Sequence, residues 1–241
     1  MSKLKRVVLK ISGEAMSGIE KNGFDTEAIH FITQEINDAV TKTKTQLAIV
    51  VGGGNQIRGS QLVKELGTTP VIGDQAGMLA TLINALILQD FLEHIHKLET
   101  RVSSAIAVEA FAKPYIRKWV ISKLNEGCTL ILAGGSGNPR FTTDTAAVLR
   151  TIELEADLVA KGTKVDGIYD KDPHKHDDAQ FIDVISHHDF ANKRLGIMDR
   201  TAITLAGEND VDIRIFNIFK KGNLTKLLSG EPIGSLITTE K

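Results

Sequence analysis

Short apolar runs rich in β-branched residues alternate along the chain with longer segments whose apolar positions recur at the helical period. Several of the short runs are apolar at every position, as strands buried on both faces of a parallel sheet are. The pattern predicts strands at Arg6–Ile11, Gln46–Val51, Thr100–Ile106, Thr129–Ala133, Asp157–Lys161, Val211–Asn217 and Ser235–Thr238.

Helices are predicted in the segments between these strands. Asp25 is the expected N-cap of the first helix. Pro114 is expected to open another helix, which Gly127 closes, and a further helix follows Thr143. The apolar face of the first helix comprises Ala28, Ile29, Ile32, Ile36 and Val40.

A long helix is expected to begin at Asp74. Its apolar stripe comprises Ala76, Leu79, Ala80, Ile83, Ile87, Phe91 and His94. The resulting order of strands and helices predicts an α/β protein, an open three-layer α/β/α sandwich around a mainly parallel sheet. The chain contains no Pro/Ser-rich linker, low-complexity tract or internal repeat, so residues 1–241 are expected to form a single domain.

Composition narrows the class of protein further. The 241 residues include 29 basic and 30 acidic side chains, a formal charge of −1, so neither nucleic acid nor an anionic membrane is an expected partner. Cys128 is the only cysteine, which excludes internal disulfides and multi-cysteine metal sites, and its apolar surroundings predict a buried, inert thiol. We found no signal-peptide pattern and no apolar run of the ~20 residues that span a bilayer, so a cytoplasmic enzyme is expected.

Glycines, hydroxyl-bearing residues and fixed charges collect where the predicted strands end. They lie in the segments Lys10–Gly13, Gly52–Arg58, Gly134–Asp144 and Lys161–Gly167. Ligands of open α/β sheets bind beyond the carboxyl ends of the strands, and glycine lets backbone N–H groups approach phosphate oxygens. Each loop alone could be an ordinary turn, but together they predict a phosphate site. The chain has no GxxxxGK[ST] or GxGxxG motif, so the site would use another architecture.

Several of these segments resemble the successive motifs of bacterial uridylate kinases, in the amino acid kinase superfamily. They are KISGE, VVGGGNQIRG, GDQAGMLAT, GSGNPRFTTDTAA, KGTKVDGIYDKDP and GIMD. The resemblance runs from about Lys5 to Ile237, and its most specific element is the GNPxFTTDTAA segment followed by TKVDGIYxxDP. The chain departs from the common family pattern at Gln75 and Ala76, at Arg140 and at Gly162.

The resemblance implies an amino acid kinase-like enzyme that transfers the γ-phosphoryl group of Mg²⁺–ATP to UMP, giving UDP and ADP in pyrimidine nucleotide biosynthesis. It implies an N-terminal part that binds the acceptor and a C-terminal part, from about residue 150, that binds ATP. The acceptor phosphate is largely dianionic near neutral pH, so the reaction needs charge neutralisation and no general base. Mg²⁺ would be carried with ATP, and no metal site of the protein's own is implied.

The matching motifs also imply roles for individual residues. The implied catalytic residues are Lys10, Arg58, Asp144 and Lys161. The implied ATP-binding residues are Lys10, Ile11, Ser12, Gly13, Gly54, Arg58, Thr163, Tyr169 and Asp172. The implied UMP-binding residues are Gly53, Asp74, Ser136, Gly137, Asn138, Pro139, Arg140, Phe141, Thr142 and Thr143. The family's segment linked to allosteric activation matches Gly18, Ile19, Glu20, Lys21, Asn22 and Gly23.

Simpler interpretations stay open for some of these residues. Lys10 and Lys161 could be exposed lysines at strand ends, and Asp74, Asp144 and Asp199 could be helix N-caps. The polar stretch Asp170–Gln180 predicts a solvated loop, because as a calcium loop it lacks both the required glycine and the closing glutamate.

The resemblance further implies a homohexamer built from dimers, activated by GTP and inhibited by UTP. Leu82, Leu86 and Leu88 lie off the predicted stripe of the long helix and add apolar surface for such contacts. Two other functions remain open: a phosphotransferase of the same superfamily acting on another small acid or phosphate, and a non-catalytic protein that binds nucleotides or oxoanions. Turnover with Mg–ATP and a panel of acceptors would separate the three.

Overall fold

The computed structural model describes residues 3–18, 22–193 and 195–239. Its main sheet consists of β1 (Arg6–Ile11), β2 (Gln46–Val51), β3 (Thr100–Ser104), β4 (Lys113–Pro114), β5 (Thr129–Ala133), β6 (Leu158–Thr163), β9 (Val184–Ser186), β10 (Ile213–Asn217) and β11 (Ser235–Thr238). These nine strands lie in the order β4-β3-β5-β2-β1-β6-β10-β11-β9. All neighbouring strands are parallel except β10 and β11. The predicted mainly parallel α/β sheet is confirmed.

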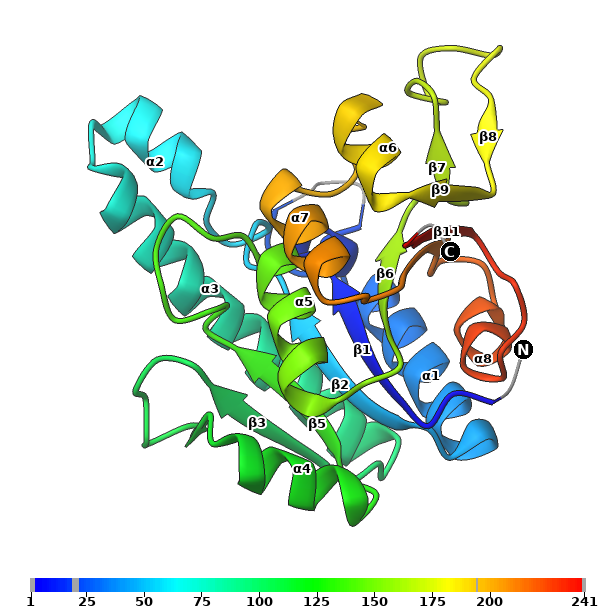
Figure 1. The fold of residues 1–241 in the computed structure, drawn as a ribbon. Helices are drawn as coiled ribbons and strands as arrows, with labels where there is room; N and C mark the ends of the chain where they lie inside the picture. Colours follow the sequence, from blue (N-terminus) through cyan, green and yellow to red (C-terminus); the bar gives the residue numbers. More distant parts are fainter. Residues whose placement is uncertain (1–2, 19–21, 194, 240–241) are drawn as a thin grey trace.

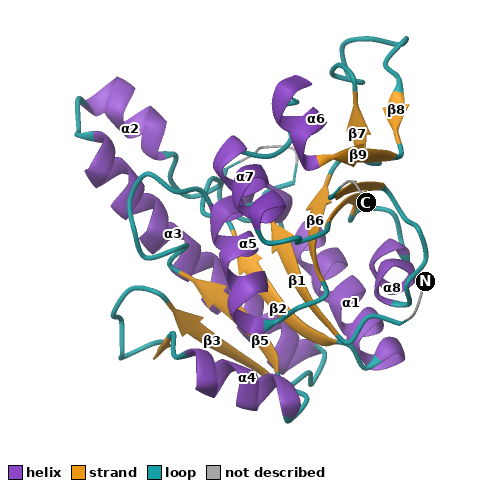
Figure 2. Cartoon of the chain, viewed as in Figure 1, coloured by secondary structure: helices purple, strands orange, loops and turns teal. Residues whose placement is uncertain are grey.

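Helices cover both faces of this sheet (Figure 1). One face carries α1 (Thr26–Thr43), α3 (Pro70–Asp90) with its π-helical continuation η2 (Phe91–Ile95), and α8 (Asn223–Leu228). The other face carries α4 (Arg117–Asn125), α5 (Thr143–Leu154), α6 (His187–Lys193) and α7 (Arg200–Glu208). The 3₁₀ helix η1 (Gly13–Met16) follows β1, and α2 (Gly59–Leu66) precedes α3. The three layers are visible in Figure 2.

The central strands β1, β2 and β5 are mostly apolar because each contributes to two hydrophobic cores. On β1, Val7, Leu9 and Ile11 face the core beneath α1, α3 and α8, whereas Val8 faces the core beneath α4 to α7. Side chains alternate along a strand, so Lys10 lies on the same face as Val8, beneath α5. The sheet therefore directs this lysine toward the helix that carries Asp144.

The predicted strands agree with the structure at β1, β2, β5 and β11, and elsewhere they differ by a few residues at an end. Pro114 opens no helix: it lies in the edge strand β4, and α4 begins three residues later at Arg117. Proline is compatible with an edge strand because it needs no partner for a backbone N–H group. The short strands β4 and β9 have too few residues to produce a pattern in the sequence.

The long helix α3 begins earlier than predicted and faces the sheet with different residues. The Thr69 hydroxyl caps it and Pro70 occupies its first turn, so Asp74 lies one turn inside the helix and is not its N-cap. Of the predicted apolar stripe only Ala80 is buried, whereas Leu79 is 50% and Ile83 45% exposed. The side chains buried against the sheet are Ala80, Thr81, Leu82, Asn84, Ala85 and Leu88.

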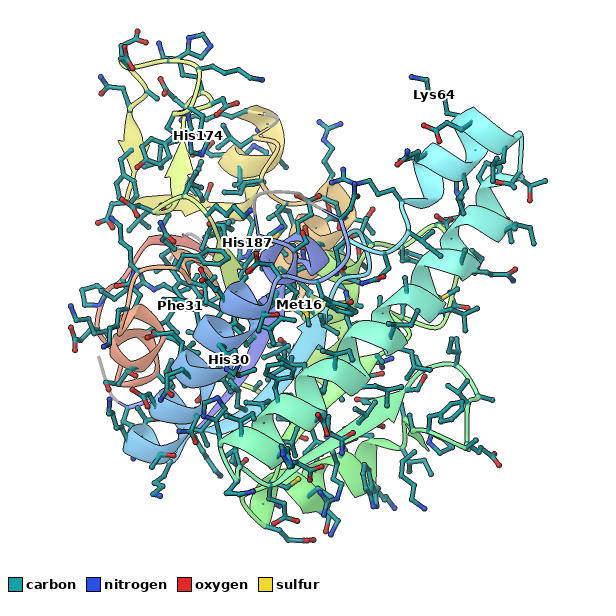
Figure 3. All side chains as sticks on the ribbon, turned by 180° about the vertical axis from the view of Figure 1, so that it is seen from behind. Met16, His30, Phe31, Lys64, His174 and His187 are labelled. Carbon is teal, nitrogen blue, oxygen red and sulfur yellow. The ribbon has the colours of Figure 1, made fainter. Side chains whose placement is uncertain are left out.

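Two projections flank the side on which β1 and β6 end. One is α2, which carries Lys64, and the other is the hairpin of β7 (Ile168–Tyr169) and β8 (Phe181–Ile182), whose loop carries His174 (Figure 3). The loop of this hairpin contains the polar stretch Asp170–Gln180, and His174 is exposed, as the prediction of a solvated loop requires.

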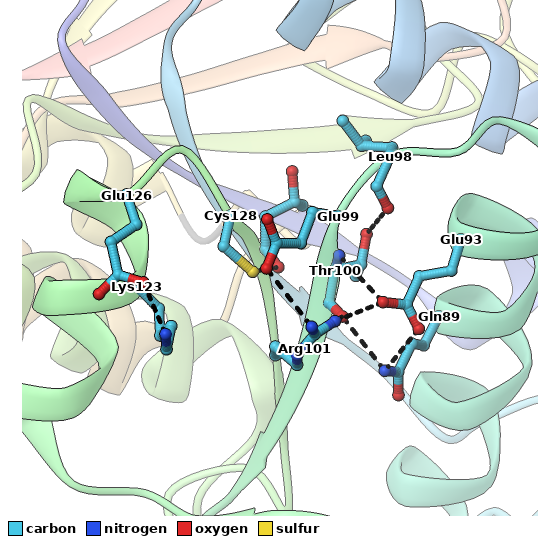
Figure 4. Close-up of polar contacts among 10 residues, drawn as sticks. Gln89, Glu93, Leu98, Glu99, Thr100, Arg101, Lys123, Glu126 and Cys128 are labelled. Atoms are coloured by element: carbon cyan, nitrogen blue, oxygen red, sulfur yellow. Dashed lines mark hydrogen bonds and ion pairs between the residues drawn. The ribbon is translucent and has the colours of Figure 1, made fainter.

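Polar contacts and a buried thiol lie at the opposite end of the sheet (Figure 4). Arg101 of β3 forms an ion pair with Glu93 of η2, and this contact connects the end of the α3–η2 helix to the sheet. Cys128 is 2% exposed, and burial raises the pKa of its thiol to about 11. The prediction of a buried, inert cysteine agrees with this environment.

Pro70–Ile95, which is α3 with η2, is the one helix of the described residues that is long and apolar enough to cross a membrane by length and composition. No apolar run long enough to span a bilayer was predicted from the sequence, because the polar residues Thr81 and Asn84 interrupt the apolar residues of this segment. Core helices of water-soluble proteins pass the same test, and the inner face of α3 packs on β2, β3 and β5.

Candidate active site

Lys10 and Lys161 are neighbours across two parallel strands. The register pairs Lys10 of β1 with Lys161 of β6, so both side chains rise on the face covered by α5. They are only 7% and 8% exposed. The interpretation of these residues as exposed strand-end lysines is therefore wrong.

Asp144 lies between the two ammonium groups. It occupies the first turn of α5 and is 7% exposed. Its Oδ1 lies 2.8 Å from Lys10 Nζ, an ion pair without the alignment of a hydrogen bond, and its Oδ2 accepts a hydrogen bond from Lys161 Nζ at 2.5 Å. Lys161 Nζ also donates to the carbonyl oxygen of Ile197 at 2.5 Å. We call Lys10, Asp144 and Lys161 the charge cluster.

The charge cluster holds two positive charges and one negative charge in a nearly dry site. Burial alone would raise the pKa of Asp144, but the charges of Lys10 and Lys161 outweigh burial and hold that pKa below its usual value. Burial and the charge of Lys10 lower the pKa of Lys161 to about 8, against the opposing effect of Asp144. The excess positive charge is available to a polyanion that enters the site.

Threonine and aspartate side chains fix the start of α5. The Thr142 hydroxyl accepts from the backbone N–H of Asp144 at 3.0 Å, so Thr142 is the N-cap and the N-cap interpretation of Asp144 is wrong. Asp199 caps α7 by accepting from the Ala202 N–H at 2.8 Å, which confirms the capping interpretation of that residue. Asp199 also accepts hydrogen bonds from the Thr142 and Thr145 hydroxyls, so it joins α7 to the site.

A first cavity, of about 340 Å³, adjoins the charge cluster through the residue before Asp144. The residues expected to bind UMP that line this cavity are Gly53, Asp74, Asn138, Phe141, Thr142 and Thr143. Gly54 and Arg58, which are expected to bind ATP, line it as well. Ser136, Gly137, Pro139 and Arg140 belong to the same loop but do not line the cavity. The lining residues that the sequence motifs did not indicate are Glu14, Ile57, Gly59, Ser60, Gly73, Gly77, Met78, Thr81 and Gly135. Gly73, Gly77 and Thr81 could have been placed on one helix face from their spacing along α3.

Asp74 joins α3 to the loop that follows β5. Its Oδ2 accepts a hydrogen bond from the backbone N–H of Arg140 at 2.9 Å. Arg140 has a left-handed backbone conformation, with φ of 72°, which aims this N–H at the carboxylate. The other end of the loop is held by α3 as well, because the Gly134 N–H donates to Thr81 Oγ1 at 2.7 Å.

The glycines at the end of β2 allow close approach of backbone to α3. A Cβ on Gly53 would lie 2.8 Å from Ala80 Cβ and 2.8 Å from the Gly77 carbonyl oxygen, so only glycine fits there. Arg58 at the start of α2 forms an ion pair with Glu14 across the mouth of the cavity. Both side chains are partly exposed, so an incoming phosphate could replace Glu14 as the partner of Arg58.

A second cavity, of about 480 Å³, adjoins the charge cluster through Ile197. Ile197, whose carbonyl accepts from Lys161, lines it together with Tyr169 and Asp172 of the β7–β8 hairpin. Thr163 does not line this cavity, but its hydroxyl accepts from the Val165 N–H at 3.3 Å and donates to the Val165 carbonyl at 2.7 Å, which shapes the adjoining loop. Ser12 lies between β1 and η1, and Gly13, the first residue of η1, lies beside Gly52 and Gly54.

The segment matched to allosteric activation is described in part. Gly18, Asn22 and Gly23 belong to the described residues, whereas Ile19, Glu20 and Lys21 lie outside them. The Gly18 carbonyl accepts from Lys164 Nζ at 3.1 Å, and the Gly23 N–H donates to the Asn55 carbonyl at 2.8 Å. The segment therefore contacts the loop after β6 at one end and the loop after β2 at the other.

No group of three or more His, Cys, Asp or Glu side chains in the described residues could hold a metal ion. Asp144 offers one carboxylate, and its Oδ1 receives no hydrogen bond. Mg²⁺ commonly binds through one or two carboxylates, substrate phosphates and water. The residues present thus fit Mg²⁺ that arrives with a nucleotide, and Asp144 would offer it a carboxylate oxygen.

Two buried lysines beside a helix N-terminus, with glycine-rich turns that line an adjoining cavity, are typical of a phosphotransferase. Comparison with protein families agrees with this class. The chain belongs to the amino acid kinase family, whose model matches residues 5–217.

Solved structures similar to this chain include two bacterial UMP kinases. The UMP kinase of Bacillus anthracis is 32% identical with a TM-score of 0.94, over 99% of this chain and 98% of that one. The UMP kinase of Ureaplasma parvum is 32% identical with a TM-score of 0.89, over 99% of this chain and 100% of that one. The uridylate kinase of Archaeoglobus fulgidus, at 24% identity and a TM-score of 0.71 over 96% and 99% of the chains, shares the fold. The resemblance stated from the sequence motifs is confirmed.

Proposed function

We propose that this protein transfers the γ-phosphoryl group of Mg–ATP to UMP, yielding UDP and ADP in the biosynthesis of pyrimidine nucleotides. The observation that carries the proposal is the charge cluster, which adjoins both cavities. It adjoins the first cavity through Thr143, next to Asp144, and the second through Ile197, which accepts from Lys161. Charge needed at the point of transfer would thus be available to both nucleotides.

The first cavity is the proposed acceptor site. Asp74 on its wall would accept a hydrogen bond from a ribose hydroxyl of UMP, and residues Ser136 to Thr143 would surround the uracil. Gly53 would bring backbone N–H groups toward the acceptor phosphate, and Arg58 would close over the phosphates as a multidentate donor.

The second cavity is the proposed site for the base and ribose of ATP, with Thr163, Tyr169 and Asp172 around them. Its phosphates would extend toward Lys10 to Gly13 and Gly54. The N-terminal part of the chain would thus bind the acceptor, and the part from about residue 150 would bind most of ATP.

The chain's own residues would act by placing charge, since a dianionic phosphate acceptor needs no base. Lys10 and Lys161 would neutralise charge that develops on the transferring group, and Asp144 would hold both ammonium groups in position. Bound Mg²⁺ would neutralise phosphate charge and orient the phosphates of ATP. Asp144 would offer a carboxylate oxygen to this ion.

A coupled assay of ADP release tests the proposal. The expected result is turnover with UMP well above CMP, dUMP and non-nucleotide acceptors. Turnover with a small carboxylate or another phosphate in place of UMP would indicate a different phosphotransferase of the family. Binding of nucleotide with no turnover on any acceptor would indicate a binding protein.

We further propose a homohexamer built from dimers, in the cytoplasm, with activation by GTP and inhibition by UTP. Support for assembly comes from the outer face of α3, where Ile72, Leu79 and Ile83 are 51%, 50% and 45% exposed. The sequence predicted this additional apolar surface at Leu82, Leu86 and Leu88, but Leu82 and Leu88 pack in the core. Exposed apolar stripes of this kind mark protein contacts.

A further inference from the structure

Two asparagines, one in the glycine-rich segment after β2 and one in α3, form a buried amide pair beside the phosphate loops. Asn55 follows the glycine triplet Gly52–Gly54 and is 2% exposed; Asn84 lies in the middle of α3 and is fully buried. Asn84 Nδ2 donates to Asn55 Oδ1 at 2.6 Å, and Asn55 Nδ2 donates to Asn84 Oδ1 at 3.3 Å. The two side chains thus bind each other through both amides.

The remaining hydrogen atoms of the pair hold two backbone segments. Asn84 Nδ2 donates to the Gly52 carbonyl at 2.6 Å, which fixes the first residue of the triplet. Asn55 Nδ2 donates to the Gly23 carbonyl at 2.7 Å, and the Asn55 carbonyl accepts from the Gly23 N–H at 2.8 Å. The chain at Gly23 is therefore joined to Asn55 in both directions.

The pair also contacts the turn after β1. A Cβ on Gly13 would lie 2.3 Å from Asn55 Oδ1 and 2.9 Å from the Gly54 backbone nitrogen. Gly13 thus packs directly on the amide pair and the triplet. Because Gly13 and Gly54 are proposed to contact ATP phosphates, and Gly53 the acceptor phosphate, the pair supports groups that approach both nucleotides.

A buried polar network of this kind is rigid when every group is satisfied, and it is costly when one partner is lost. Here both amides use all of their hydrogen atoms and both oxygens. An apolar side chain at position 84 would leave the buried carbonyl of Gly52 without this donor, and one at position 55 would do the same to the partly buried carbonyl of Gly23. Neither asparagine lines the first or the second cavity, where the two nucleotides are proposed to bind.

We propose that Asn55 and Asn84 are positioning residues: they set the glycine triplet for phosphoryl transfer and couple its position to the chain at Gly23. The inference rests on the proposed UMP kinase activity for its kinetic part. A change in the backbone at Gly23 would move Asn55, and through Asn84 and Gly52 it would displace the triplet. Displacements of about 1 Å can lower turnover by about 10²-fold.

The test uses the full-length protein with Asn84→Ala, and Thr33→Ala as its matched control. Thr33 is also fully buried and donates to a carbonyl, that of Ile29 at 2.9 Å, but it lies within α1. Three quantities are measured for each protein: kcat and KM for UMP and ATP, the midpoint of thermal unfolding, and hydrogen exchange of the Gly23 amide.

Asn84→Ala should lower kcat by at least about tenfold, with smaller changes in both KM values, because the triplet would act mainly at the moment of transfer. Exchange of the Gly23 amide should accelerate by about tenfold or more. Thr33→Ala should lower the unfolding midpoint and leave kinetics and Gly23 exchange unchanged. If Asn84→Ala does not fold, Asn84→Ser, which keeps one donor for Gly52, is measured with the same expectations at smaller amplitude.

Folded variants at position 84 with wild-type kcat would overturn the positioning role. A loss of kcat with unchanged Gly23 exchange would overturn the coupling. If the wild-type protein does not phosphorylate UMP, the proposed function fails, and the exchange measurement still decides whether the pair couples Gly23 to α3.

Discussion

Replacing Asp144 by Asn should move the alkaline limb of kcat/KM to lower pH. In the wild-type protein burial and Lys10 lower the pKa of Lys161 to about 8, while Asp144 opposes them. The pH dependence of kcat/KM reports ionisations of the free enzyme. If charged Lys161 is needed for transfer, wild-type kcat/KM should fall as pH rises through about 8.

The size of the shift follows from the geometry of the cluster. Asp144 Oδ2 lies 2.5 Å from Lys161 Nζ, in a site from which water is largely excluded. Two unit charges 4 Å apart interact with about 4 kcal/mol at an effective dielectric constant of about 20, and about 1.4 kcal/mol corresponds to one pKa unit. Water that enters the variant's site would recover part of this energy. We therefore expect the limb to move by at least about one pH unit.

Initial rates for wild type, Asp144→Asn and Lys161→Arg would be measured from about pH 6 to pH 9.5. Asp38→Asn is the control, because Asp38 pairs with Lys42 on the surface of α1 and should leave the profile unchanged. Arginine stays charged over this range, so Lys161→Arg should lose the limb whatever its absolute rate. If Asp144→Asn does not shift the alkaline fall of kcat/KM, or if this fall persists in Lys161→Arg, the ionisation does not belong to Lys161, which would falsify the assignment.

The same cluster sets a pH dependence of stability. Because the native pKa of Lys161 lies below its unfolded value, the unfolded chain binds more protons between the two, and the free energy of unfolding should rise with pH above about 8. Asp144 affects stability at acid pH. Because its native pKa is lowered, its contribution to the free energy of unfolding is present at neutral pH and is lost as the carboxylate is protonated in acid. Asp144→Asn should cost about 3–5 kcal/mol at pH 7, as loss of one partner of a buried ion pair does. Chemical denaturation as a function of pH measures both effects.

Other predictions concern the acceptor site and the assembly. Lys10→Ala should lower kcat by about 10²-fold or more with a smaller change in UMP affinity, and turnover within a few-fold of wild type would remove Lys10 from catalysis. UMP should exceed dUMP in kcat/KM by tens- to hundreds-fold, because a carboxylate deprived of its donor costs about 1–3 kcal/mol. Asp74→Asn should narrow that gap, and an unchanged ratio would show that Asp74 serves only to hold Arg140. Leu79→Glu on the exposed face of α3 should reduce the mass measured by light scattering with the fold intact, and a wild-type monomer at micromolar concentration would contradict the proposed hexamer.

The pattern of the sequence was enough to predict the fold class. The strands that form the centre of the sheet, β1, β2 and β5, are apolar at most positions, and this signal is local. Glycines and lysines at strand ends were equally visible, and the rule that parallel strands end on one edge of the sheet brought them together. Caps such as Asp25 and Asp199 were also readable, because a cap acts on a backbone N–H group three residues away.

Contacts between distant segments were decided only by the tertiary structure. Nothing in the spacing of Lys10, Asp144 and Lys161 shows that the first and last share a register position and that the middle one lies between them. The face of α3 was misassigned because its buried side includes Thr81 and Asn84, which look like solvent-facing residues until their partners Gly134 and Gly52 are known. A polar side chain can be buried when a backbone group elsewhere in the chain satisfies it, and that partner is a property of the fold and not of the local sequence.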